Sequence, residues 1–314
     1  MPEKLLRPGH RMIRILFLTV LVMELLFQFS LAEGQERQLT DEIGRKVKIS
    51  NVPKKIISLA PNITEILFAL ELDEEILAVT DFCDYPKAAL TKPRIGGFVN
   101  PNIEMIVSLN PDLIIATRDG NRRETIQRLN DLGLSVYVIN PRGYDGVMKT
   151  IQNIGEVVGR RDEARKIATT MRTRKERVLA LTQSLPKPGV FFQVGEAPMI
   201  TVGRETLAND LIRLAGGRSI SGNEAIQYPH YSIETIMLKA PEVIIISSME
   251  RKRDYLNSIK KWQNWKSIPA VRMNAIYVVD TNLVDRSSPR IGEGLETMVR
   301  MIHPEAMRGK KSNP

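Results

Sequence analysis

The sequence has 314 residues, with 45 Lys and Arg against 36 Asp and Glu, and a formal net charge of +9. The charges are scattered apart from a basic tail with Arg308, Lys310 and Lys311, a pattern more typical of a solvated end than of a nucleic-acid-binding arm. The single cysteine, Cys83, excludes an internal disulfide, and it lies too far from the N-terminus to be a lipid-modified first residue of a mature chain.

Residues 1–32 have the layout of an export signal. Four basic side chains precede an apolar run over 15–31 that is interrupted by Glu24, and the small residues Ser30 and Ala32 offer a cleavage site. We therefore expect a cleaved signal peptide and a mature protein free in the periplasm. An uncleaved membrane anchor is the alternative, because the apolar run is almost long enough to span a bilayer.

Residues 38–142 alternate between short apolar runs and amphipathic segments. We expect strands over 55–60, 76–79, 113–116 and 136–139, and helices over 64–72, 103–109 and 122–132. Alternation of this kind predicts a mostly parallel sheet with helices on its faces.

Residues 143–186 carry no strand pattern. A helix is expected over 143–158, and 162–185 then runs for 24 residues without Pro or Gly, which is about 36 Å of helix. A flexible linker would be rich in Gly and Ser, so this composition predicts a stiff helical connector.

Residues 187–303 resume the alternation, with strands expected over 190–194, 243–247 and 276–279 and helices over 207–215, 233–239 and 290–302. The predicted fold is α/β, with two Rossmann-like lobes joined by a single long α-helix. The predicted limits are a signal peptide over 1–32, an N-terminal lobe over 38–142, connecting helices over 143–186, a C-terminal lobe over 187–303 and a basic tail over 304–314.

An internal repeat supports two lobes built alike. The segment 102–115 recurs as 232–245 with six of fourteen positions identical and an offset of 130 residues. Each copy has an Asn or Ser suited to cap a helix, then a short helix, a proline that ends it and a buried strand. Chance similarity between common helix–strand pieces is the alternative interpretation.

Glu104 and Glu234 occupy the same place in the two copies, in the first turn of each helix. A carboxylate there is stabilised by the helix dipole by roughly 0.3–1 kcal/mol, which is sufficient reason for either residue alone. A matched pair on two lobes also suits two basic sockets on a two-fold partner, where such charges govern docking.

The segment 59–70 predicts a strand, a sharp turn and a helix. We interpret Asn62 as the N-cap and Glu65, three residues later, as the second half of a capping box. Ligands of open α/β sheets gather at the carboxyl ends of strands, so this turn is a candidate wall of a ligand cleft.

Several short motifs follow one another in an order typical of one protein family. They are Leu59–Glu65, Asp84–Pro86, Asn102–Glu104 with Pro111 and Asp112, Asn209–Leu211 with Gly216 and Gly217, and Ser287–Arg290. In this order they resemble the cobalamin and iron-siderophore solute-binding proteins of ABC importers, most of all the cobalamin-binding members. The resemblance covers about residues 38–303. Each motif is weak alone, and their shared order is the specific signal.

The resemblance implies a helical-backbone periplasmic binding protein with little hinge motion. Such a protein captures a corrinoid (cobalamin) between its lobes, needs no cofactor and delivers the ligand to an inner-membrane ABC permease. It also implies that Glu104 and Glu234 dock onto arginines of the permease. We expect a monomer that binds no nucleic acid. An iron-siderophore or haem carrier, and a periplasmic sensor of the same fold, are the alternatives.

The resemblance also implies a cleft lined by aromatic side chains, which suit a broad, largely apolar ring system. The matching positions are Phe82, Phe98 and Tyr228, although Phe82 and Phe98 are also readable as core residues. Two positions depart from the family pattern. Thr117 stands where a tryptophan is expected, and Asn282 replaces an aspartate that hydrogen-bonds ligand amides. The full set of residues that we assign to ligand binding is Pro61, Asn62, Phe82, Tyr85, Phe98, Tyr228, Asn282 and Arg286.

Few residues are available for metal or covalent chemistry. His230 is the only histidine in the body of the predicted fold, and it could ligate a cobalt or iron centre, although a hydrogen-bonding role is commoner. One histidine does not make a zinc or manganese site, so no metal site is predicted. The sequence has no GxSxG, HExxH or phosphate-loop motif, and we do not expect an enzyme.

Overall fold

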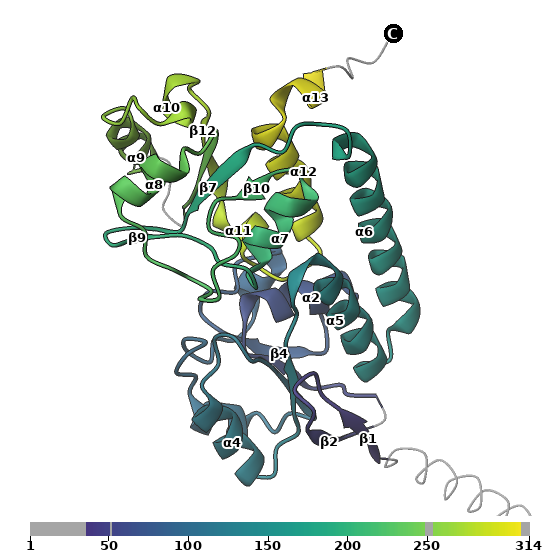
Figure 1. The fold of residues 1–314 in the computed structure, drawn as a ribbon. Coiled ribbons are helices and arrows are strands. Elements are labelled where there is room, and N and C mark those ends of the chain that lie inside the picture. Colours follow the sequence, from purple (N-terminus) through teal and green to yellow (C-terminus); the bar gives the residue numbers. More distant parts are fainter. Residues whose placement is uncertain (1–35, 51, 249–253, 309–314) are drawn as a thin grey trace, which may run out of the picture.

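The computed structural model describes residues 36–50, 52–248 and 254–308. The chain folds into two α/β lobes with one long helix beside them (Figure 1). The signal peptide expected over 1–32 lies outside the described residues, as does the end of the basic tail. None of the described helices combines the length and the apolar character that a membrane span requires.

The N-terminal lobe has a four-stranded parallel sheet in the order β4-β3-β5-β6. Its strands are β3 Ile56–Ser58, β4 Ile76–Val79, β5 Leu113–Thr117 and β6 Val136–Ile139. Its helices are α2 Pro61–Ala69, the 3-10 helix η1 Lys87–Thr91, α3 Ile103–Ser108 and α4 Arg123–Asp131. An antiparallel hairpin of β1 Glu36–Thr40 and β2 Lys46–Ser50 precedes them, and this hairpin was not predicted.

The C-terminal lobe has a second four-stranded parallel sheet, in the order β10-β7-β11-β12. Its strands are β7 Gly189–Gln193, β10 Arg218–Ser219, β11 Val243–Ser248 and β12 Ile276–Asp280, with a small hairpin of β8 Gly195–Glu196 and β9 Met199–Ile200. Its helices are α7 Leu207–Leu214, α8 Ile233–Lys239, α9 Asp254–Trp262, α10 Pro269–Arg272, α11 Thr281–Val284, α12 Ile291–Ile302 and α13 Pro304–Arg308.

The two sheets have the same topology. In each lobe the first strand pairs with the second on one side and with the third on the other, and the fourth strand follows the third. The repeated segments form α3 with β5 and α8 with β11. Asn102 and Ser232 cap the two helices by accepting hydrogen bonds from the backbone N–H groups of Met105 and Thr235. The predicted fold class, including the lobes built alike, is therefore confirmed.

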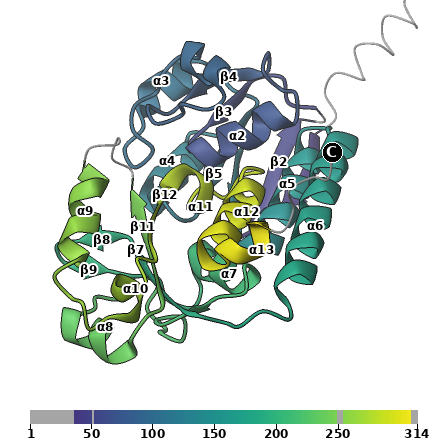
Figure 2. The same cartoon turned by 90° about the horizontal axis from the view of Figure 1, so that it is seen from above.

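The connector consists of α5 Gly143–Val157 and α6 Arg161–Thr182, which lie side by side along one edge of the molecule (Figure 2). The 22 residues of α6 make it about 33 Å long. Tyr144 in α5 donates a hydrogen bond to the carbonyl oxygen of Met171 at 3.0 Å, and Arg174 pairs with Glu296 of α12 at 3.3 Å. The long helix is thus bonded to the other connecting helix and to the C-terminal lobe.

Alternating strand residues divide the core into layers. Leu113 and Ile115 of β5 face a large buried cluster that continues through α5 and α6 into the second lobe, whereas Ile114 faces a separate cluster under α3 and α4. In the same way Val190 of β7 joins the shared cluster and Phe191 packs under α8, α9 and α10. Side chains alternate along a strand, so each sheet has two buried faces. One face packs against helices of its own lobe, and the other face contributes to the cluster that both lobes share.

The start of α2 differs from the prediction. The helix begins at Pro61, its N-cap is Ala60, and no side chain caps it. Proline fits the first helical position because its missing N–H would be unpaired there in any case. Asn62 is therefore the second residue of the helix and not its cap, and the capping box with Glu65 was a wrong interpretation.

Gly294 sets how closely α12 approaches α11. A Cβ atom at this position would lie 2.0 Å from the carbonyl oxygen of Leu283. Gly294→Ala should therefore lower the free energy of unfolding by about 1–3 kcal/mol, because the backbone of α11 must move to admit the methyl group. Urea denaturation measures the change. Gly97→Ala is the matched control, since a Cβ there meets nothing within 4 Å. If Gly294→Ala is as stable as that control, then the close approach of α12 to α11 does not require a glycine at position 294.

Candidate functional site

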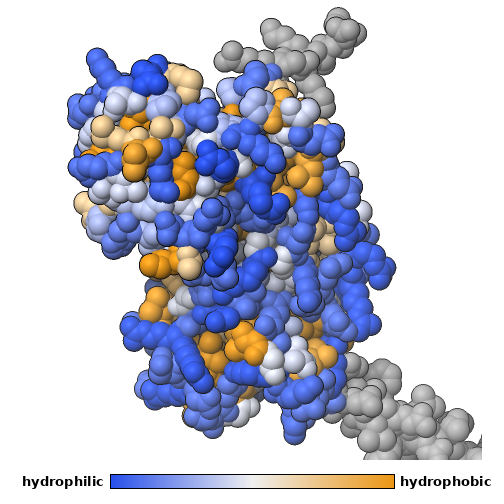
Figure 3. Space-filling view, in the orientation of Figure 1, coloured by the Kyte–Doolittle hydropathy of each residue, from blue (hydrophilic) through white to orange (hydrophobic). Residues whose placement is uncertain are grey.

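A cavity of about 480 Å³ lies between the two lobes. Its wall includes residues at the carboxyl ends of β3, β5 and β6 in one lobe, together with the start of α7 and residues of α11 in the other. Strand ends beside helix N-termini are where open α/β sheets bind ligands, and the volume falls in the usual range for small-molecule sites, about 300–1,000 Å³. The space-filling view shows a notch between the lobes with apolar atoms at its edge (Figure 3).

Most residues that the sequence assigned to ligand binding lie together in this cavity wall. They are Pro61, Asn62, Phe82, Phe98, Tyr228, Asn282 and Arg286. Tyr85 is not part of the wall, because the guanidinium group of Arg290 covers its ring at 4.0 Å from the centroid. Tyr85 therefore belongs to the contact between the lobes.

The aromatic side chains of the cavity come from both lobes. Phe82 is 59% exposed and packs edge-to-face against Phe98 with ring centroids 6.2 Å apart, while Tyr228, 53% exposed, faces them from the C-terminal lobe. The interpretation of Phe82 as a core residue is wrong, since a core ring would be buried. Exposed rings on facing walls provide flat apolar surfaces for a ligand.

The loop that carries Phe98 is held by a residue that the sequence analysis missed. The buried Asn121 donates hydrogen bonds to the carbonyl oxygens of Leu59 and Phe98 and accepts one from the backbone N–H of Thr117. Gly120 makes room for the ring, because it has a φ of 126° and a Cβ there would lie 2.7 Å from Phe98. The sequence signal was the Asp-Gly-Asn turn at the end of the predicted strand.

Two arginines of the cavity wall already bind carboxylates of the protein. Arg142 pairs with Asp119 at 2.7 Å, and Arg286 pairs with Asp84 at 2.7 Å and with Glu65 at 2.9 Å. Desolvation, followed by the charges of Asp285 and Asp119, raises the pKa of Tyr228 above its usual value. Within the described part of the chain no lysine lines this cavity.

Glu65 joins the two lobes. Its side chain is 1% exposed and accepts hydrogen bonds from Arg286 at 2.9 Å and from the Ser288 hydroxyl at 2.6 Å, while Arg290 lies 3.5 Å away. All three partners come from the C-terminal lobe. We name Glu65, Arg286, Ser288 and Arg290 the lobe clasp. A carboxylate in this place binds the other lobe and not the backbone of its own helix.

The residues suggested for docking or for metal ligation lie outside the cavity wall. Glu104 and Glu234 are exposed on the first turns of α3 and α8. His230 is exposed and does not line the cavity, and the hydroxyl of its neighbour Tyr231 is bonded to Glu224. No group of three or more His, Cys, Asp or Glu side chains in the described ranges is arranged to hold a metal ion. Cys83 is a free, buried thiol.

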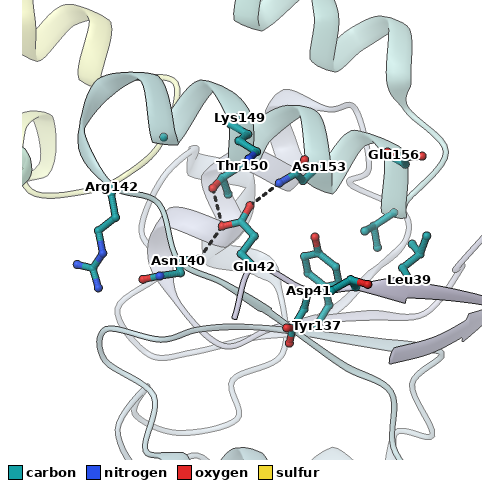
Figure 4. Close-up of a pocket in the computed structure, with 13 residues that line it drawn as sticks. Leu39, Asp41, Glu42, Tyr137, Asn140, Arg142, Lys149, Thr150, Asn153 and Glu156 are labelled. Carbon is teal, nitrogen blue, oxygen red and sulfur yellow. Dashed lines mark hydrogen bonds between the residues drawn. The ribbon is translucent and has the colours of Figure 1, made fainter. Parts of the chain in front are cut away.

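A second pocket lies between the N-terminal hairpin and α5 (Figure 4). Its most prominent carboxylate, Glu42, accepts hydrogen bonds from the backbone N–H of Asn140, from Thr150 and from Asn153 at 2.6–2.9 Å. These contacts fasten the hairpin to the lobe. Because the Glu42 carboxylate is already satisfied, and Phe82, Phe98 and Tyr228 line the interlobe cavity, that cavity is the stronger candidate for the functional site.

The fold and the cavity together define a two-lobed solute-binding protein, a class in which the ligand sits between the lobes. Residues 56–283 match the family model described as periplasmic binding protein, and the chain belongs to this family. Members of this family bind solutes and are not enzymes.

Several individual proteins are similar to this chain over most of their length. The vitamin B12-binding protein of Vibrio vulnificus is 29% identical over 238 residues, which cover 76% of this chain and 85% of that protein. An ABC transporter substrate-binding lipoprotein of Bacillus subtilis, YvrC, is 28% identical and covers 86% of each chain. The crystal structure of periplasmic vitamin B12-binding protein BtuF of Vibrio cholerae superposes with a TM-score of 0.72 at 28% identity, covering 82% of this chain and 98% of that one. A periplasmic substrate-binding role with an ABC transporter is therefore supported.

The lobe clasp gives a stability prediction. Glu65→Gln leaves Arg286 and Arg290 short of a buried partner charge, so the free energy of unfolding should fall by about 3–5 kcal/mol. Asp84→Asn removes the exposed partner of the same arginine, and its cost should stay below about 1 kcal/mol. Chemical denaturation of both variants makes the comparison. Equal losses in the two would contradict the central role given to Glu65.

Proposed function

We propose that this protein captures a corrinoid, cobalamin or a close relative, in the interlobe cavity and delivers it to an ABC importer. The observation that carries the proposal is the pair of facing aromatic walls, Phe82 with Phe98 on one lobe and Tyr228 on the other. Flat rings of this kind bury a large apolar area against a macrocycle. In the same cavity wall, Asn62 and Asn282 supply amide groups that suit the amide side chains of a corrinoid.

The charges of the cavity favour an amide-bearing ligand over a carboxylate-bearing one. Haem presents propionates and many ferric chelates are anionic, and such groups bind most strongly to unpaired arginines. Here Arg142 is paired with Asp119, and Arg286 with Glu65 and Asp84. A corrinoid whose side chains are amides does not need an unpaired arginine in the cavity wall. This comparison ranks the corrinoid above haem and the iron siderophores.

Export of the protein to the periplasm is consistent with the proposed role in ligand uptake. The leader at residues 1–32 has the layout of a signal peptide, and we propose that it is cleaved and that the mature protein works free in the periplasm. The ligand would then be met outside the inner membrane, where the permease takes it up.

The ligand assignment is tested by isothermal titration calorimetry of the mature protein with cyanocobalamin, cobinamide, haem and a ferric siderophore. We expect a corrinoid dissociation constant in the nanomolar range, about −12 kcal/mol, and no binding of comparable strength for haem or the siderophore. Phe82→Ala should weaken corrinoid binding about tenfold or more through the lost ring contact. Leu90→Ala, which removes a side chain of similar exposure outside the cavity, is the control. Preferential binding of haem or of the siderophore would replace the corrinoid by that ligand.

We further propose that Glu104 and Glu234 dock the protein onto the permease. The two carboxylates occupy equivalent positions in the twin lobes, and an exposed apolar residue follows each by three positions, Val107 at 42% and Met237 at 39% exposure. A hydrogen bond from Ser232 lowers the pKa of Glu234. An acid beside an apolar contact, repeated on both lobes, suits a partner with two matching basic sockets.

Charge reversal tests the docking surface. The double variant Glu104→Lys and Glu234→Lys should keep the corrinoid affinity of the native protein and lose binding to its own ABC permease, measured by interferometry on permease in nanodiscs. Glu124→Lys is the matched control, because Glu124 is an exposed glutamate at the same position of α4. Unchanged permease binding by the double variant would remove the docking role, and a protein that binds corrinoid but no permease would fit a periplasmic sensor.

A further inference from the structure

One stretch of the interlobe cavity wall lies in the connection between β6 and α5. It consists of four consecutive residues, 140–143, and we name it the 140–143 segment. The backbone N–H of Asn140, its first residue, donates a hydrogen bond to the Glu42 carboxylate at 2.6 Å. Glu42 belongs to the turn between β1 and β2 and does not line this cavity. A part of the chain outside the cavity therefore holds the start of this wall segment.

The turn over residues 41–45 caps the free edge of the N-terminal sheet. Because β6 is the last strand of that sheet, backbone groups of alternate residues along it point away from β5. Four of these groups find partners in the turn, so that it takes the place of a neighbouring strand. The bonds join the Val136 carbonyl to the Arg45 guanidinium at 2.9 Å, the Val138 N–H to the Asp41 carboxylate at 3.3 Å, the Val138 carbonyl to the Glu42 N–H at 3.1 Å and the Asn140 N–H to the Glu42 carboxylate.

The turn is itself fixed by Asp41. The Asp41 carboxylate is buried and accepts hydrogen bonds from the backbone N–H groups of Ile43 and Arg45 at 3.2 and 2.8 Å. It also accepts one from the Arg45 side chain at 2.8 Å. Gly44 completes the turn with a φ of 88°, a conformation that favours glycine. The turn therefore has one defined shape, and Glu42 projects from it in a defined direction.

Glu42 connects the two elements between which the 140–143 segment runs. Besides the N–H of Asn140 at the end of β6, its carboxylate accepts hydrogen bonds from the Thr150 hydroxyl at 2.8 Å and the Asn153 amide at 2.9 Å, both in α5. Figure 4 shows the carboxylate between these donors. One side chain thus fixes the end of β6 relative to α5, and the four residues of the segment must span the distance between them.

We propose that Glu42 is a positioning residue for ligand binding, which acts from outside the cavity by ordering the 140–143 segment of its wall. This inference rests on the proposed corrinoid-binding function. A wall segment that is ordered before the ligand arrives loses less conformational freedom on binding, and this contributes to affinity. Without the Glu42 carboxylate, the N–H of Asn140 and the two donors of α5 lose their shared acceptor. The segment then samples more conformations, and the ligand must order it.

The test compares Glu42→Ala with Arg37→Ala, which removes another anchor of the same hairpin. Arg37 donates to the carbonyl oxygens of Glu156 and Val157 at the far end of α5 and has no bond to the 140–143 segment. Calorimetric titration of the mature protein with cyanocobalamin should show about tenfold weaker binding for Glu42→Ala and native affinity for Arg37→Ala. Thermal unfolding should show that both variants are less stable than the native protein, because each loses hydrogen bonds of the hairpin.

Glu42→Gln is the conservative variant. Its amide oxygen can accept from Asn140 and Thr150, and its NH₂ group can donate to the side-chain oxygen of Asn153 once that amide is turned over. We expect Glu42→Gln to bind cyanocobalamin within about twofold of the native protein. Hydrogen exchange followed by mass spectrometry gives a second readout without ligand. The peptide that contains Asn140 should exchange faster in Glu42→Ala than in the native protein, in Glu42→Gln or in Arg37→Ala.

The two proposals fail in different ways. A native protein that binds no corrinoid overturns the proposed ligand, and the exchange of the Asn140 peptide then decides whether Glu42 orders the segment. A native protein that binds cyanocobalamin, with Glu42→Ala equal to it in affinity or no weaker than Arg37→Ala, overturns this inference alone. If Glu42→Ala does not fold, Glu42→Asp takes its place, because its carboxylate is one methylene group shorter and is drawn back from Asn140. Native affinity in Glu42→Asp would equally overturn the positioning role.

Discussion

The arrangement of the lobes depends on a buried carboxylate, Glu65, at their contact. Removing a charge from water costs several kcal/mol, and only close partners offset that cost. Glu65 finds them in Arg286, Ser288 and Arg290, all on the opposite lobe. If the lobes separated at this point, the carboxylate would lose these partners, so the clasp favours one relative position. The interlobe cavity has its shape because that position is favoured.

The clasp acts together with two further constraints. One buried cluster runs through both lobes, and α6 is bonded to α5 on one side and to α12 on the other. Arg290 also covers Tyr85, in the loop that carries Phe82, so the contact that joins the lobes positions an aromatic side chain of the cavity. Walls that are set before the ligand arrives need little ordering on binding, and preorganisation of this kind contributes to affinity.

Local pattern was enough to predict the N-terminal sheet, three of the four strands of the C-terminal sheet, the twin lobes and the long helix, because buried strands such as Leu113–Thr117 are continuous apolar runs. The two-residue edge strand β10 Arg218–Ser219 was not predicted. Local pattern was not enough where the same residue spacing is compatible with two different structures. Glu65 three residues after Asn62 fits a capping box equally well, and only its contact with Ser288, 223 positions away, distinguishes the two interpretations. The hairpin over 36–50 was missed although Val47 and Ile49 alternate with lysines, since two short strands give a weak signal.

One residue, Arg286, connects stability with selectivity. As a free side chain in the cavity wall it would attract ligand carboxylates, because a guanidinium group binds them in a bidentate way. In this fold it is committed to Glu65 and Asp84, so the same ion pairs that hold the lobes also withdraw a positive charge from the ligand. Arg142 is withdrawn in the same manner by Asp119, which leaves Asp285 and Glu205 as the cavity charges without an arginine partner among the described residues. The cavity therefore presents carboxylates and amides beside aromatic rings, a combination that suits the N–H donors of the proposed ligand.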